Sequence, residues 1–139
     1  NMLRSLLFRS LRRLSNSTHG HELTSDINFT QRKDSFEKYY TRNEPLKGYC
    51  TAEASLAYSK RNPEVHSSNF KKPIGSDLTL SSVGVGTYTN EDQQHTDLSM
   101  YNAIVDSVLS GGVNIVDTCS SFRHSRSERT VNAALRFLV

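Results

Sequence analysis

The fold of this chain is decided by residues 82–138, which contain in order SVGVG (82–86), DLSMYNAIVDSVLS (97–110), VNIVD (113–117) and SERTVNAALRFL (127–138). The first and third segments are short and rich in β-branched residues, which is typical of strands. In the second segment, apolar side chains recur at the spacing of one helical face: Met100, Tyr101, Ile104, Val105, Val108 and Leu109. Gly111 and Gly112 then end this helix. The order strand, helix, strand, helix predicts an α/β fold with a parallel sheet and helical crossovers.

The last segment predicts a second helix with Ser127 as its N-cap. Its buried face is expected to hold Val131, Ala134, Leu135 and Leu138. Two parallel strands on their own leave unpaired edges and a bare apolar face. We therefore expect residues 70–139 to be the beginning of a larger, incomplete domain.

Upstream of these elements, residues 70–81 predict a small hairpin whose turn is Gly75-Ser76. Residues 26–69 are expected to form an extended arm, because they lack sustained periodicity. This region and the adjoining Phe70 hold seven of the 12 aromatic residues, which predicts that the arm lies on its own domain or on a neighbour. Within the arm, TAEASLAYSK (51–60) predicts a short helix capped by Thr51 and ended before Pro63.

Residues 1–25 have a different composition from the rest of the chain. The whole chain carries 17 basic and 14 acidic residues, yet residues 1–21 hold four arginines and no acid. MLRSLLFRSLRRL (2–14) places leucines at helical spacing between arginines, and serine, asparagine and threonine follow. An arginine-rich, serine-rich and acid-free amphipathic segment is typical of a mitochondrial transit peptide. The alternatives are a surface helix of a cytosolic protein and a retained helix that lies on the inner membrane.

Charge and composition exclude several classes of protein. Residues 22–139 carry 13 basic and 14 acidic side chains, so this part of the chain is not expected to bind nucleic acid. No window approaches the roughly 20 apolar residues of a membrane-spanning helix. Cys50 and Cys119 form no CxxC pair, which argues against a disulfide scaffold or a zinc ribbon.

Residues 48–139 resemble a known family. The stretches GYCTAEASLAYSKRNPEVHSSNF (48–70), LTLSSVGVGTYTNEDQQHTDLSMYNAIVDSVLSGGVNIVDT (78–118) and RHSRSERTVNAALRFL (123–138) are similar to the opening of an aldo-keto reductase. The resemblance implies that residues 70–139 are the first two β/α units of an eight-stranded TIM barrel, with the site at the carboxyl ends of the strands.

The resemblance also implies a chemistry, hydride transfer from NADPH to a carbonyl with a tyrosine as general acid. Gly86, Thr87 and Asp117 match positions near the nicotinamide, and Asp117 also matches the catalytic aspartate. The tyrosine is expected five residues after Asp117, where this chain has Phe122. Phenylalanine has no hydroxyl, so it cannot act as a general acid. The family's lysine and histidine fall outside residues 1–139.

Each of these residues also has a structural interpretation. Asp117 can cap the following turn, and Gly84 and Gly86 alone do not make a dinucleotide fingerprint. The arginines 123, 126 and 129 could guide phosphate or form a solvated cluster. His19 and His21 are too few for a metal site, and we expect none, with His95 and His124 at the surface. Cys119 is expected to be a buried filler rather than a nucleophile.

Two functions follow from the sequence. The first is a reductase-like protein that lacks the general acid and serves as an accessory or structural subunit of a mitochondrial assembly, a respiratory complex or the ribosome. Its partners would be other subunits and the inner-membrane surface. The alternative is an active NADPH-dependent carbonyl reductase of the mitochondrial matrix.

Overall fold

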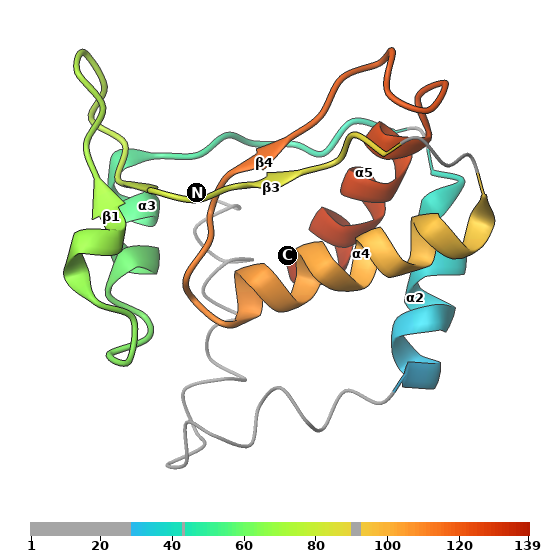
Figure 1. Cartoon of the computed structure of the whole chain (residues 1–139), viewed down its shortest axis with the longest axis horizontal. Coiled ribbons are helices and arrows are strands. Elements are labelled where there is room, and N and C mark those ends of the chain that lie inside the picture. The colour runs from blue at the N-terminus through green and yellow to red at the C-terminus, as the bar shows by residue number, and fades with distance from the viewer. Residues whose placement is uncertain (1–28, 43, 90–92) are drawn as a thin grey trace.

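The computed structural model describes residues 29–42, 44–89 and 93–139 (Figure 1). The expected leader over residues 1–25 lies outside the described residues. The helices are α2 (Phe29–Tyr40), α3 (Ala52–Ser59), a 3₁₀ turn η1 (Ser67–Asn69), α4 (Gln94–Leu109) and α5 (Arg126–Leu138). The strands are β1 (Phe70–Lys71), β2 (Leu80–Ser81), β3 (Val85–Gly86) and β4 (Val116–Asp117). They form two separate two-stranded sheets in this part of the chain.

The core lies where α2, α4 and α5 pack together (Figure 1). The apolar stripe predicted for the first helix is the buried face of α4, with Tyr101, Ile104 and Val105 fully buried. Phe36 of α2 lies edge-on against Tyr101, with ring centroids 5.4 Å apart. Burying these large apolar side chains is the main source of stability in this part of the molecule.

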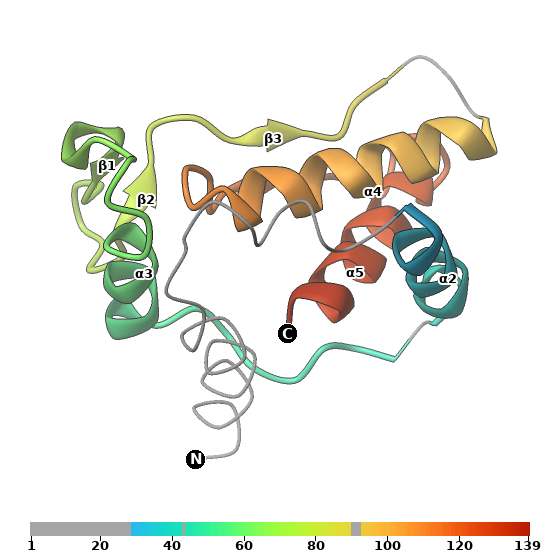
Figure 2. The same cartoon turned by 90° about the horizontal axis from the view of Figure 1, so that it is seen from below.

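A satellite unit formed by α3, η1 and the β1–β2 hairpin lies at the other end of α4 (Figures 1 and 2). The hydroxyl of Thr51 accepts the N–H of Ala54, which confirms the predicted cap of α3. The antiparallel pairing of β1 with β2 confirms the hairpin, with shorter strands than expected.

Polar side chains of the satellite unit reach the carbonyls at the end of α4. The Asn62 amide donates to the Ser110 carbonyl at 2.6 Å, and the Asn69 amide donates to the Gly112 carbonyl at 2.6 Å. The Tyr58 hydroxyl lies 2.7 Å from the Val108 carbonyl. Burial raises the pKa of this hydroxyl. The helix ends as predicted at a glycine with a left-handed backbone, Gly111, at φ 77°.

Strands β3 and β4 are parallel and run alongside α4, which connects them (Figure 2). The pairing joins Val85 to Val116 and Gly86 to Asp117. This sheet has only two strands in the described part of the chain, so one edge of each strand has no strand partner there.

The expected fold class is wrong. Two β/α units of a TIM barrel are not evident, because each strand pairs over two residues only and the two sheets are separate. The structure is a small mixed fold of four α-helices and two two-stranded sheets within the described residues. Periodicity predicts the type of an element, but it does not give the length over which strands pair.

The expected extended arm over residues 26–69 is wrong for residues 29–40, which form helix α2. This helix was missed because it carries few apolar side chains. Its buried face includes an arginine whose charge is compensated by an ion pair. Arg32 of α2 is 8% exposed and pairs with Asp106 of α4 at 2.6 Å. The prediction that aromatic residues anchor this region is confirmed for Phe36, which packs in the core of the same chain.

Candidate functional site

The carboxyl ends of β3 and β4 bring together three residues that the sequence assigns to a site. Gly86 and Asp117 are direct partners across the parallel pair. Thr87 continues the pairing, since its N–H donates to the Asp117 carbonyl at 3.1 Å. The Thr87 hydroxyl donates to the same carbonyl at 2.8 Å and the residue is fully buried, so this hydroxyl faces the protein interior. Asp117 itself is exposed.

Phe122 lies in the loop that follows β4, half-buried against the ring of Tyr88. The ring centroids are 5.1 Å apart and the planes are inclined at 64°. The position expected to hold a general acid therefore makes an aromatic contact and offers no proton.

The three residues that the resemblance assigns to NADPH offer few polar groups to a ligand. The Thr87 hydroxyl donates to a backbone carbonyl inside the protein. Gly86 has open space around it but no polar side chain. The remaining group is the exposed Asp117 carboxylate. The strand ends thus present an exposed acidic site whose charged group is Asp117.

A second polar cluster, which the sequence did not reveal, centres on Asp97 in the first turn of α4. This carboxylate is fully buried. It lies 2.5 Å from Arg123 and 2.5 Å from Arg126, and it accepts the Tyr40 hydroxyl at 2.8 Å. Burial raises the pKa of Tyr40, and the bond to Asp97 raises it further. The prediction of a solvated arginine cluster is wrong for Arg123, which is 6% exposed.

This cluster fixes the start of α5. Arg123, His124 and Ser125 all have left-handed backbone, at φ 53°, 53° and 64°. Such a conformation costs about 1–2 kcal/mol for each residue with a side chain. The pairs of Asp97 with Arg123 and Arg126 hold both ends of this strained turn, and so offset its cost.

The prediction that Ser127 caps the second helix is wrong. The cap position is Ser125, whose side chain makes no capping bond to the helix. The Ser127 hydroxyl instead donates to the Thr87 carbonyl at 2.8 Å, and Ser127 is fully buried. This bond attaches α5 to the end of β3, which positions the loop carrying Phe122 above the strand ends.

Cys119 is exposed, so the expectation of a buried filler is wrong. Its thiol lies 3.2 Å from the Ser121 hydroxyl. Hydrogen bonds from the hydroxyl and the N–H of Ser121 lower the pKa of this thiol. His95 and His124 are exposed as expected. Among the described residues, no three His, Cys, Asp or Glu side chains gather closely enough to hold a metal ion.

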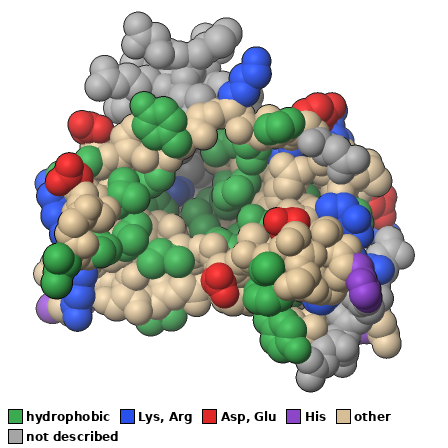
Figure 3. Space-filling view, turned by 90° about the horizontal axis from the view of Figure 1, so that it is seen from above, with side chains coloured by type: hydrophobic (Ala, Val, Ile, Leu, Met, Phe, Trp, Pro, Cys, Tyr) green, Lys and Arg blue, Asp and Glu red, His purple; other side chains and the backbone are tan. Residues whose placement is uncertain are grey.

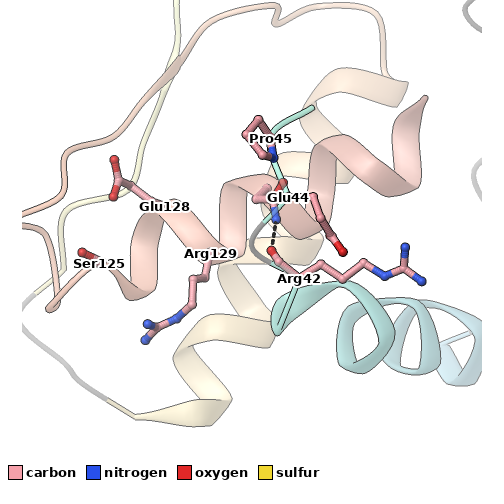
Figure 4. Close-up of a pocket in the computed structure, with 7 residues that line it drawn as sticks. Arg42, Glu44, Pro45, Ser125, Glu128 and Arg129 are labelled. Atoms are coloured by element: carbon pink, nitrogen blue, oxygen red, sulfur yellow. Dashed lines mark hydrogen bonds between the residues drawn. The ribbon is translucent and has the colours of Figure 1, made fainter. Parts of the chain in front are cut away.

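A shallow hollow of about 500 Å³ lies between the end of α2 and the start of α5 (Figure 4). Its lining residues are Arg42, Glu44, Pro45, Ser125, Glu128, Arg129 and Asn132. The guanidinium groups of Arg42 and Arg129 point away from each other, so they do not converge on one anion (Figure 4). The side chains of Asn132 and Arg136 tie the segment after α2 to α5 by bonding the Arg42 and Glu44 carbonyls. We interpret this hollow as a packing feature.

Comparisons with protein-family models, curated proteins and solved structures give no match to this chain. The resemblance to aldo-keto reductases therefore stays a prediction from the residues. None of the described helices is long and apolar enough to cross a membrane.

Proposed function

We propose that this chain is a non-catalytic subunit of a mitochondrial assembly and does not reduce carbonyls. The observation that carries this proposal is the arrangement at the strand ends, where Phe122 packs on Tyr88 and the Thr87 hydroxyl is buried. The polar side chain left there, Asp117, has no hydrogen bond or ion pair within the described residues. A lone carboxylate with no acid beside it supplies neither proton transfer to a carbonyl oxygen nor hydride transfer.

Two surface features support a role in an assembly. Both strands of the β3–β4 pair keep an edge without a strand partner in the described residues, and such edges favour pairing with further chain. Large hydrophobic side chains are exposed around the molecule, including Leu46, Tyr49, Leu135 and Val139. Hydrophobic side chains also surround a hollow on one face (Figure 3). Exposed apolar side chains that gather around a hollow are a feature of interaction sites.

The location and assembly can be tested with the full chain carrying a carboxyl-terminal epitope tag in cultured cells. We expect the tagged chain in the mitochondrial fraction, and on native gels in mild detergent it should migrate far above its own 15.7 kDa. As a matched control, replacing Arg4, Arg9, Arg12 and Arg13 with glutamate should leave it in the cytosol. Migration as a free monomer from intact mitochondria would contradict the proposal.

The absence of catalysis is tested by following NADPH absorbance with a panel of aldehydes and the purified full chain. We expect no consumption above the blank, for the unmodified chain and for Phe122→Tyr alike, because Gly86, Thr87 and Asp117 do not hold the cofactor. Turnover at roughly 1 per second or faster, as is usual for enzymes, would overturn this part of the proposal.

A further inference from the structure

The exposed acidic site at the strand ends has an aromatic border. Tyr88 and Phe122, which we call the aromatic corner, meet at 64° with centroids 5.1 Å apart. Tyr88 is 67% exposed, so most of its ring surface faces solvent. An exposed tyrosine ring held against a second ring provides π surface that a cation can approach.

Strand geometry places the Asp117 side chain on the same side as the Tyr88 ring. Thr87 points inward, where it is fully buried, so its neighbours Gly86 and Tyr88 point outward. Asp117 is the register partner of Gly86 in a parallel pair, and partners in register project their side chains to the same face.

Nothing in the described residues fills the space over Gly86. A Cβ added to this glycine would meet no atom within 4 Å. Asp117 is exposed, and its carboxylate has no hydrogen bond or ion pair with any described residue. This differs from Asp97, whose carboxylate contacts two arginines. Within the described residues, the negative charge of Asp117 therefore has no counter-charge.

We propose that Asp117 and the aromatic corner bind an organic ammonium group. The carboxylate attracts the charge, and the rings of Tyr88 and Phe122 contact the methyl or methylene groups next to the nitrogen. The ligand class is a primary or methylated alkylamine, either as a small molecule or as the side chain of a lysine in a peptide. An inorganic cation such as Na⁺ keeps its water shell and gains little from the rings. This site does not depend on the assembly proposed above, because it is complete within the chain.

The experiment is a titration of the isotope-labelled full chain followed by NMR of the backbone amides. The probes are methylammonium, tetramethylammonium and N-acetyl-lysine amide as chlorides, each compared with NaCl at equal ionic strength. We expect saturable shifts at residues 86–88 and 117–122 in the millimolar range with the organic cations. The N-acetyl-lysine amide arm shows whether a lysine side chain is accepted as well as a free amine.

Variants decide which groups bind. Tyr88→Leu should weaken binding of tetramethylammonium by about two- to fivefold, which corresponds to one exposed cation–π contact. With Asp117→Asn, the amide shifts should no longer saturate at the cation concentrations that the titration can reach. Tyr49→Leu and Asp77→Asn, which replace an exposed tyrosine and an exposed aspartate elsewhere, should leave it unchanged. Linear shifts equal to those with NaCl, or equal affinity in all four variants, would overturn the proposal, whatever the chain's partners in the cell.

Discussion

Asp97 and Asp117 show how differently one residue type is used in two regions of this molecule. Asp97, at the start of α4, is fully buried and contacts Arg123, Arg126 and Tyr40. Asp117, at the end of β4, is exposed and makes no side-chain bond within the described residues. A buried carboxylate exists only if its charge is compensated, whereas an exposed one is stabilised by water. The first aspartate therefore serves stability, and the second is free to bind a ligand.

The largest effect is expected from Asp97→Asn, which removes the buried negative charge that pairs with Arg123 and Arg126. We expect the free energy of unfolding to fall by about 3–5 kcal/mol. The matched variant Asp117→Asn should change it by less than about 0.5 kcal/mol, as exposed substitutions usually do. Urea denaturation of both variants measures the difference. Equal losses would remove the contrast between the two aspartates.

Ser127→Ala tests whether the strand ends depend on the helical core. The variant removes the hydroxyl that donates to the Thr87 carbonyl at a fully buried position. We expect a loss of about 1–3 kcal/mol in unfolding free energy. Ser121→Ala, at an exposed position in the same loop, is the control and should be close to neutral. A neutral Ser127→Ala would mean that α5 and β3 are not coupled through this bond.

Tyr101→Phe is expected to stabilise the core slightly. The Tyr101 hydroxyl is buried and has no hydrogen-bond partner in the described residues. Removing an unsatisfied buried group should raise the unfolding free energy by about 1 kcal/mol. A loss of stability in urea would show instead that the hydroxyl has a partner, such as a buried water molecule.

Tyr101→Phe should also change how the stability of the chain depends on alkaline pH. Burial raises the pKa of Tyr101 to about 12, above its ordinary value of 10.0. Between these two values the folded chain keeps a proton that the unfolded chain loses, so stability falls as the pH rises from 10 towards 12. Tyr101→Phe should reduce this slope. Tyr40 and Tyr58, whose pKa values are also raised, should account for part of the slope that remains.

The smallest effect concerns Cys119 and leaves stability unchanged. Because bonds from Ser121 lower the pKa of its thiol, alkylation by iodoacetamide should reach half its maximal rate below the usual range for cysteine, roughly pH 8.5. Ser121→Ala should shift this profile to higher pH. Mass spectrometry of the two cysteine peptides separates Cys119 from Cys50, which is also exposed. An identical profile in the variant would contradict the role given to Ser121.

The sequence predicted elements whose signal is local. The apolar stripe of α4, the cap at Thr51 and the glycine after α4 depend on residues a few positions apart, so each can be recognised from the sequence. Helix α2 could not be recognised this way, because its buried face includes Arg32. That arginine is compensated by Asp106, 74 residues further along the chain.

In the candidate site, too, contacts between residues far apart in the chain could not be predicted from the sequence. The resemblance assigns Gly86 and Asp117 to one site, and the structure pairs them across the two parallel strands. The burial of Asp97 and Arg123 depends on a contact across 26 residues, for which a single sequence carries no signal. The barrel failed as a prediction because the length of strand pairing and the number of strands are properties of the whole sheet.

The bonds from the satellite unit to the end of α4 carry a consequence for local unfolding. The last carbonyls of a helix have no partner within the helix. Here Tyr58 and Asn62 bond the Val108 and Ser110 carbonyls from 50 and 48 residues away, and Asn69 bonds the Gly112 carbonyl just after the helix. When the satellite unit opens, these carbonyls lose their side-chain donors, and the last turn of α4 should fray with it. The amides of Leu109 and Ser110 should then exchange with deuterium at the pace of the α3 amides, and much faster than those of Ile104 and Val105.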